Sequence, residues 1–251
     1  MTTDTVPKIC SRRLVLADRE FTLTGMAKGS GMICPNMATM LAFIGTDASV
    51  DQAILQVALD SAVASTFNCI TVDGDTSTND ACVVMATGEV ELPSDAAAVH
   101  AFTVALTDVC RELAFAIVRD GEGATKFIEI TVNGANTEAE AKQVAYTIAH
   151  SPLVKTAMFA SDPNWGRLLA AVGRSDLKDL DVDSVSIAIN EVEIVTDGSR
   201  AANYDEDAGV RAMADKDIRI VISLNRGAVS ATVWTCDLSH DYVKINAEYR
   251  T

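Results

Sequence analysis

The chain has 251 residues, of which 49% are hydrophobic and 5% aromatic, and its formal net charge at pH 7 is −15. These totals predict a globular protein with a sizeable aliphatic core, in one large domain or two small ones, and they argue against a disordered chain. The acidic balance also argues against non-specific binding to nucleic acid or to an anionic membrane, because both need a basic face.

The first half of the chain reads as strands followed by helices. Apolar spacing predicts a helix that begins near Val50, and Ser94 is expected to cap the next helix, which ends at Asp120-Gly121. In chain order the expected elements are strands at 13–18 and 21–26, a glycine-rich loop at 25–36, a strand at 39–46, a helix from 50, a polar loop at 71–80, a strand from 81 and a helix at 95–119.

The second half mixes helices with hairpin-like strands. Thr137 and Glu140 have the spacing of a capping box, so a helix is expected from there to near Pro152. The remaining expected elements are a small-residue loop at 121–126, a strand at 126–134, a helix opened by Pro163 and β-rich runs between 183 and 236. The order predicts an α/β fold of layered α+β type. We divide it into a catalytic portion at 1–130 and a C-terminal α/β portion at 131–251.

Cysteines and histidines are not arranged as metal ligands. The six cysteines include no CxxC pair and the three histidines are scattered, so we expect no metal site. The opening stretch MTTDTVPKICSRR lacks the apolar segment of a signal peptide, and no apolar run reaches transmembrane length. We therefore expect a cytoplasmic protein with reduced thiols and no membrane partner.

The stretch GMAKGSGMICPNMATML, residues 25–41, surrounds one lysine and one threonine with small residues. A threonine hydroxyl needs a base, and the α-amine of an N-terminal threonine, with a pKa near ~8, can serve. An internal threonine gains that amine by attacking the preceding carbonyl and cutting the backbone. Ala38-Thr39 can thus be read as a self-cleavage site, although an internal threonine before a strand is usually structural.

Several long motifs carry a resemblance to a known family. They are MTTDT at 1–5, GMAKGSGMICPNMATML at 25–41, TFNCITVDGDTSTND at 66–80, DGEGATKF at 120–127, SPLVKTAMFASDPNWGR at 151–167 and KINAEYRT at 244–251. The chain resembles the ArgJ family, the ornithine acetyltransferases of arginine biosynthesis, some of which also act as N-acetylglutamate synthases. The resemblance implies the N-terminal-nucleophile-type fold of DmpA and ArgJ, with mixed sheets flanked by helices.

The resemblance also implies the site residues. Cleavage between Ala38 and Thr39 would free Thr39 as the nucleophile. The implied substrate-binding residues are Thr2, Lys28, Thr39, Glu122, Asn246 and Thr251. An α-carboxylate needs a fixed cation or hydroxyl donors, a side-chain ammonium needs a carboxylate such as Glu122, and an amide such as Asn246 can orient either substrate.

The implied reaction moves an acetyl group from N2-acetylornithine to glutamate through an acetyl-threonine, with no bound cofactor. Acetyl-CoA as a second donor would add N-acetylglutamate synthase activity. The implied partners are the α and β chains of one precursor in an α2β2 heterotetramer. Residues 1–38 would be the tail of the α chain and 39 onward the β chain. Family members carry a longer region before MTTDT, with a Thr-Gly pair that forms the oxyanion hole.

Two other functions stay open at this stage. A self-processing N-terminal-nucleophile amidase or aminopeptidase would share the threonine but release the acyl group to water. A chain without the oxyanion pair would be a catalytically silent fragment that acts as a structural subunit. Two polar clusters are expected to be structural: the loop with Asp73, Asp75 and Asp80, and the helix start with Asp162, Asn164, Trp165 and Arg167.

Overall fold

The computed structural model describes residues 3–35 and 40–248, which form two compact units, Met1–Gly121 and Glu122–Thr251. The first unit contains β1 (Lys8–Leu16), β2 (Arg19–Lys28), β3 (Leu41–Ser49), α1 (Gln52–Ala64), the 3₁₀ turn η1 (Phe67–Cys69), β4 (Ala81–Glu91) and α2 (Ala96–Arg119). The second contains β5 (Phe127–Ala135), α3 (Glu138–Ala149), α4 (Pro152–Phe159), α5 (Trp165–Gly173), η2 (Val182–Ser184), β6 (Ser186–Ile189), β7 (Val192–Thr196), β8 (Ser199–Arg200), α6 (Glu206–Ala212), β9 (Asp217–Ser223), β10 (Val229–Cys236) and α7 (His240–Glu248).

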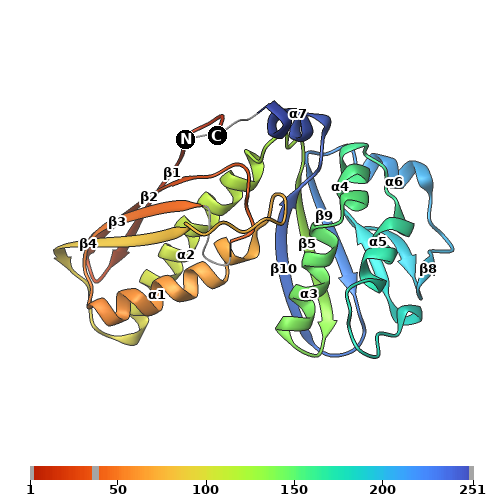
Figure 1. The fold of residues 1–251 in the computed structure, drawn as a ribbon. Coiled ribbons are helices and arrows are strands. Elements are labelled where there is room, and N and C mark those ends of the chain that lie inside the picture. The colour runs from red at the N-terminus through yellow and green to blue at the C-terminus, as the bar shows by residue number, and fades with distance from the viewer. Residues whose placement is uncertain (1–2, 36–39, 249–251) are drawn as a thin grey trace. The chain divides into compact units, whose positions relative to one another are not determined.

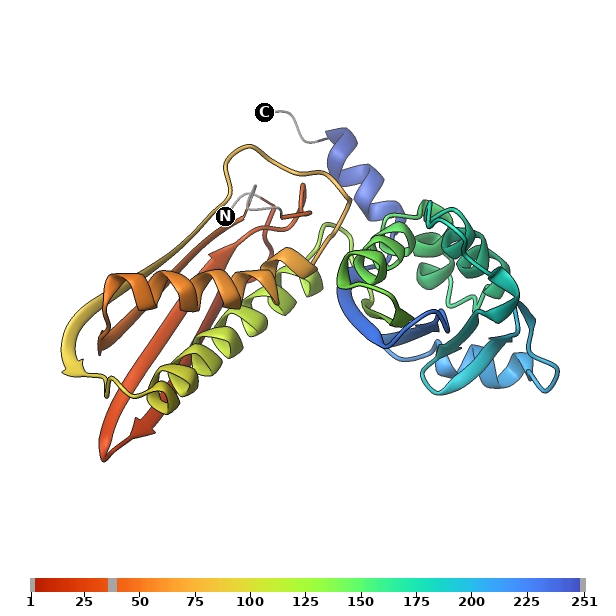
Figure 2. The same ribbon diagram turned by 90° about the horizontal axis from the view of Figure 1, so that it is seen from below.

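The first unit is a four-stranded mixed sheet in the order β1-β2-β3-β4, with α1 and α2 on one face (Figures 1 and 2). β1, β2 and β3 pair antiparallel, whereas β3 and β4 are parallel and therefore need the crossover that α1 supplies. Alternate residues such as Leu23 and Ile44 are fully buried on the helix side.

The other face of this sheet carries an exposed apolar row. Ile9, Met26, Phe43 and Val83 are aligned in register across the four strands, and their exposed fractions lie between 39% and 63%. Strands that are apolar on both faces are typical of sheets covered on both sides. The sheet of this unit therefore carries apolar side chains on both faces: the exposed row on one face, and the residues buried against α1 and α2 on the other.

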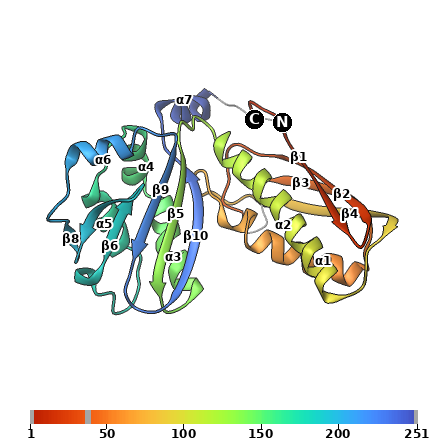
Figure 3. The same ribbon diagram turned by 180° about the vertical axis from the view of Figure 1, so that it is seen from behind.

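The second unit is a six-stranded mixed sheet in the order β10-β5-β9-β6-β7-β8. α3 and α5 cover one face, and Figure 3 shows the sheet from its other side. Aliphatic side chains from the strands and from α3, α4 and α5 form one core, with Ile130, Val144 and Val172 fully buried in it. The predicted fold class, layered α+β with mixed sheets flanked by helices, is confirmed.

One local prediction was wrong, and two helices of the structure, α4 and α6, were not predicted; the helix expected to end near Pro152 does end there, at Ala149. Asp95, and not Ser94, caps α2, because its carboxylate accepts the amide of Ala98 at 3.0 Å. Pro152 begins the separate helix α4 behind its N-cap Ser151, because a proline fits the first helical position. The region expected to be only β-rich also contains α6. The functional division at residue 130 stays a prediction, whereas the compact units divide after Gly121.

Candidate active site

The structure describes three of the predicted site residues. Lys28 belongs to the first unit, and Glu122 and Asn246 belong to the second. The other four, Thr2, Ala38, Thr39 and Thr251, lie outside the described residues, and their roles stay predictions.

Lys28 ends strand β2 and is paired in register with Leu41, the first residue of β3. Its alternation along β2 puts it on the same face as Met26. Both residues, together with Phe43, line a largely apolar pocket of about 270 Å³. A cation at the edge of an apolar surface suits a small molecule that joins a carboxylate to an alkyl chain. Leu41 follows Thr39 by two positions in the sequence.

The loop after Lys28 is held by Asp73. Its carboxylate accepts the amides of Met32 at 2.7 Å and Ile33 at 3.0 Å, and the amide of Val72 donates to the carbonyl of Ile33 at 2.7 Å. Burial raises the pKa of Asp73, although the hydrogen bonds from the backbone oppose this shift. The predicted structural role of this aspartate is confirmed. No group of three potential metal ligands occurs within residues 3–35 and 40–248.

Asp73→Ala is expected to lower the free energy of unfolding by about 2 kcal/mol, because three backbone donors, the amides of Met32, Ile33 and Asp75, lose a charged acceptor. Urea denaturation followed by circular dichroism measures this change. The matched control is Asp75→Ala, whose exposed side chain should change stability by less than about 0.5 kcal/mol. Equal effects of the two variants would contradict the structural role given to Asp73.

Glu122 and Asn246, which are 124 positions apart in the sequence, meet in the second unit. The Asn246 side-chain amide donates to the Glu122 carboxylate at 2.7 Å and to the carbonyl of Tyr242 at 3.0 Å. Asn246 lies on α7, in the last described turns of the chain, and is exposed, whereas Glu122 is half-buried. A carboxylate oriented by an amide on an accessible surface is suited to bind an ammonium group.

The loop that carries Glu122 is tightly fixed. Asp237, which is 2% exposed, accepts the amides of Thr125 and Lys126, each at 2.8 Å, and the Thr125 hydroxyl at 2.5 Å. Ser239 donates to the carbonyl of Gly123 at 2.6 Å. Both anchors stand directly before α7, so the same segment positions Glu122 and the helix that carries Asn246. Sequence reasoning missed Asp237 and Ser239, although an aspartate and a serine between a buried strand and a helix were the signal.

A second anchor joins this loop to the ASDPNWGR motif. The Lys126 ammonium donates to the Ser161 hydroxyl at 2.6 Å and to the carbonyl of Met213. Burial lowers the pKa of Lys126, and the negative charges of Asp237 and Asp215 oppose this shift. Asn164 caps α5 by accepting the amide of Arg167 at 3.1 Å. The predicted structural role of the turn at 162–167 is confirmed for Asn164.

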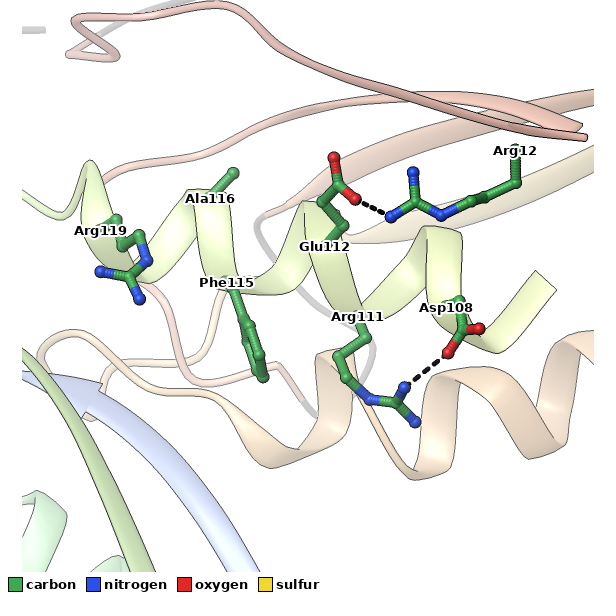
Figure 4. A pocket seen from close by; sticks show the side chains of 7 residues that line it. All are labelled: Arg12, Asp108, Arg111, Glu112, Phe115, Ala116 and Arg119. Carbon is green, nitrogen blue, oxygen red and sulfur yellow. Dashed lines mark hydrogen bonds and ion pairs between the residues drawn. The ribbon is translucent and has the colours of Figure 1, made fainter. Parts of the chain in front are cut away.

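A larger groove, of about 450 Å³, follows α2 in the first unit and contains none of the predicted site residues (Figure 4). Arg12 is paired with Glu112 across it, and Arg111 is paired with Asp108 at 2.6 Å. Two of the three arginines that line the groove face carboxylates, so most of its charge is balanced within the groove. We assign it no part in the site.

Comparisons with known proteins identify the same family as the sequence motifs. The ArgJ family model matches residues 1–251. The chain is 59% identical over 254 residues to the arginine biosynthesis bifunctional protein ArgJ of Methylococcus capsulatus, and 53% identical over 255 residues to that of Pseudomonas syringae pv. tomato. A crystal structure of the arginine biosynthesis bifunctional protein ArgJ from Bacillus halodurans is similar, with a TM-score of 0.78 and 41% identity, and the match covers 84% of this chain and 100% of that one. The chain belongs to the ArgJ family.

The matches cover 100% of this chain but only 62% and 63% of the two relatives. The structural match confirms the ArgJ-like fold that the sequence predicted. Among the described helices, none combines the length and the apolar character needed to cross a bilayer.

Proposed function

We propose that this protein is an acyltransferase that moves an acetyl group from N2-acetylornithine to glutamate in arginine biosynthesis. The observation that carries the proposal is the Glu122–Asn246 hydrogen bond, which joins two predicted substrate residues from distant motifs. Membership of the ArgJ family over the whole chain supports it. The names of the relatives refer to arginine biosynthesis and to a bifunctional protein.

The proposed reaction is a double displacement. After cleavage between Ala38 and Thr39, the Thr39 hydroxyl oxygen attacks the acetyl carbonyl carbon while the α-amine of Thr39 takes the hydroxyl proton. The carbon–nitrogen bond to ornithine breaks, and that proton passes to the departing amine. The acetyl group then stays on Thr39 as an ester. The glutamate amine attacks this ester, and the hydroxyl of Thr39 recovers a proton as N-acetylglutamate forms.

The remaining residues would hold the substrates. Lys28, with Thr2 and Thr251, would bind the α-carboxylate, and Glu122 would bind the side-chain ammonium of ornithine. The mechanism uses no bound cofactor, and acetyl-CoA as an alternative donor would make the protein an N-acetylglutamate synthase as well. We place it in the cytoplasm as α and β chains of one precursor, assembled as α2β2.

Isotope exchange tests this proposal. With N2-acetylornithine and labelled ornithine but no glutamate, a ping-pong enzyme incorporates label into acetylornithine, and adding glutamate yields N-acetylglutamate. Net release of acetate in place of N-acetylglutamate would support the amidase alternative. Absence of exchange and of product from processed protein would contradict the proposal.

Glu122→Gln tests which substrate the acidic group recognises. Loss of the carboxylate charge is expected to raise the KM for N2-acetylornithine by about tenfold, with a smaller change in the KM for glutamate, because only ornithine carries a side-chain ammonium. Initial rates with each substrate varied in turn measure the two constants. Lys142→Met is the control, because it also removes one charge in the same unit, from a half-buried side chain on α3 that is paired with Glu138. Equal rises in both KM values would refute the assignment.

A structural subunit that is silent alone is the second candidate. The exposed row of Ile9, Met26, Phe43 and Val83 favours it, because apolar patches of this kind mark surfaces that another segment covers. Co-expression with the part of the Methylococcus capsulatus relative outside the matched region separates the candidates. Activity of the chain alone supports the enzyme, activity only after co-expression supports a subunit of that enzyme, and inactivity in both supports a purely structural role.

A further inference from the structure

Three charged side chains are buried together in the first unit. Lys8 lies between Asp4 and Asp120, with its ammonium 2.8 Å from the Asp4 carboxylate and 2.5 Å from the Asp120 carboxylate. The side chains of Lys8, Asp4 and Asp120 are 0%, 1% and 6% exposed. We call these three residues the buried clamp.

The clamp reaches the backbone directly after Lys28. The same Asp4 oxygen that faces Lys8 also accepts the amide of Gly29 at 2.8 Å. On the other side, the Ser30 hydroxyl donates to the carbonyl of Asp120 at 2.6 Å. Residues 29 and 30 are thus tied both to the segment before β1 and to the C-cap of α2.

Asp120 completes the connection to the N-terminal motif. Its carboxylate accepts the amide of Thr5 at 3.0 Å and also the Thr5 hydroxyl. The clamp therefore links three of the motifs that identify the family, MTTDT, AKGSG and DGEG. Asp120 precedes Glu122 by two positions in the sequence.

Stability alone is a poor explanation for this arrangement. Removing three charges from water costs about as much as their attraction returns, so apolar residues of similar size would stabilise the fold at least as well. A carboxylate that binds both an ammonium and a backbone amide does fix the relative orientation of those two groups, because each donor must approach the carboxylate oxygen along a defined lone pair. The clamp is suited to hold one backbone geometry at Gly29, where φ is +152°.

We propose that Asp4, Lys8 and Asp120 are positioning residues that hold the Lys28–Ser30 backbone in the geometry needed to bind the substrate carboxylate. This inference rests on the proposed acetyl transfer. Asp4 acts through Gly29, and Lys8 sets the position of Asp4 against Asp120. None of the three is required to touch substrate.

The test compares Asp4→Ala, Asp4→Asn and the wild-type chain, each in its processed form and co-expressed with the part of the Methylococcus capsulatus relative that lies outside the matched region. Amide hydrogen exchange of Gly29, measured by NMR, reports the clamp without reference to activity. The exposed pair of Arg13 and Glu20 in the same sheet, whose side chains are 76% and 55% exposed, supplies the control Arg13→Met/Glu20→Gln.

Exchange at Gly29 is expected to be about tenfold faster in Asp4→Ala, with partial rescue in Asp4→Asn, which keeps an acceptor oxygen. The KM for N2-acetylornithine should rise about tenfold in Asp4→Ala while kcat changes less, and the control should match the wild type. If Asp4→Ala does not fold, Asp4→Asn decides alone.

Wild-type exchange at Gly29 in a folded Asp4 variant would overturn the proposal, and so would faster exchange with an unchanged KM. The two hypotheses fail in different ways. Absence of transfer by the wild type would refute the proposed function, and with it the role in substrate binding, whatever the exchange at Gly29 shows. Transfer by the wild type together with unchanged exchange would refute only the clamp.

Discussion

Thr39→Ala is expected to leave the chain as one uncut polypeptide and to lower kcat/KM for acetyl transfer by about 10⁴-fold or more. The substitution removes the oxygen that cuts the backbone and that later carries the acetyl group. Loss of a catalytic nucleophile removes the chemical step itself, and rate losses of this order are typical. Gel electrophoresis and the isotope-exchange assay measure the two effects.

Two matched variants make this result specific to the hydroxyl of Thr39. Thr39→Ser keeps a hydroxyl and should still cleave and turn over, more slowly. Thr147→Ala removes a hydroxyl that only bonds the carbonyl of Gln143 within α3, and it should behave like the wild type. Acetyl transfer by Thr39→Ala within tenfold of the wild-type rate would exclude Thr39 as the nucleophile.

Gly123→Ala is expected to lower the free energy of unfolding of the second unit by about 2–4 kcal/mol. Gly123 has a φ of +69°, and a Cβ there would lie 2.5 Å from the Tyr242 amide nitrogen and 2.7 Å from the Ser239 hydroxyl. A side chain at this left-handed backbone position is strained, and relieving the close contacts would require the first turn of α7 to move. The loop with Glu122 and the helix with Asn246 would separate, so the KM for N2-acetylornithine should also rise.

Gly173→Ala is the matched control for this prediction. Gly173 ends α5 in the same unit, and a Cβ there meets nothing within 4 Å. Alanine should therefore be neutral or stabilise the helix by up to about 1 kcal/mol. Urea denaturation of both variants gives the comparison, and equal stability of Gly123→Ala and the wild type would contradict the close packing of this loop against α7.

The helices were predictable from the sequence where the spacing of the apolar residues and the capping residues indicate the same element. Thr137 accepts the amide of Glu140 as its spacing predicted, and the apolar period over the helix from Val50 gave α1. α6 was missed because it is a single short amphipathic stretch with a glycine inside, between β-rich runs. α4 was not predicted because a proline such as Pro152 can follow the end of one helix and also begin the next, and here Ser151 caps the new helix.

The candidate site was predictable only through the family motifs. The local sequence around Glu122 and around Asn246 does not indicate that the two side chains are hydrogen-bonded to each other. That pairing is a consequence of the order of strands in the second sheet and of the anchors at Asp237 and Ser239. The clamp was missed for the same reason, because Asp4 and Asp120 lie at opposite ends of one unit's sequence and meet only in the fold.

The most direct test of the central claim is the intact mass of the purified protein, with and without N2-acetylornithine. The account predicts two polypeptides that divide between Ala38 and Thr39, and one added acetyl group on the fragment that begins with Thr39. A single species at the full 26.6 kDa that gains no acetyl group, even after co-expression with the unmatched part of the Methylococcus capsulatus relative, would contradict it. Thr39 would then have no free α-amine, and the chain would not perform the proposed transfer.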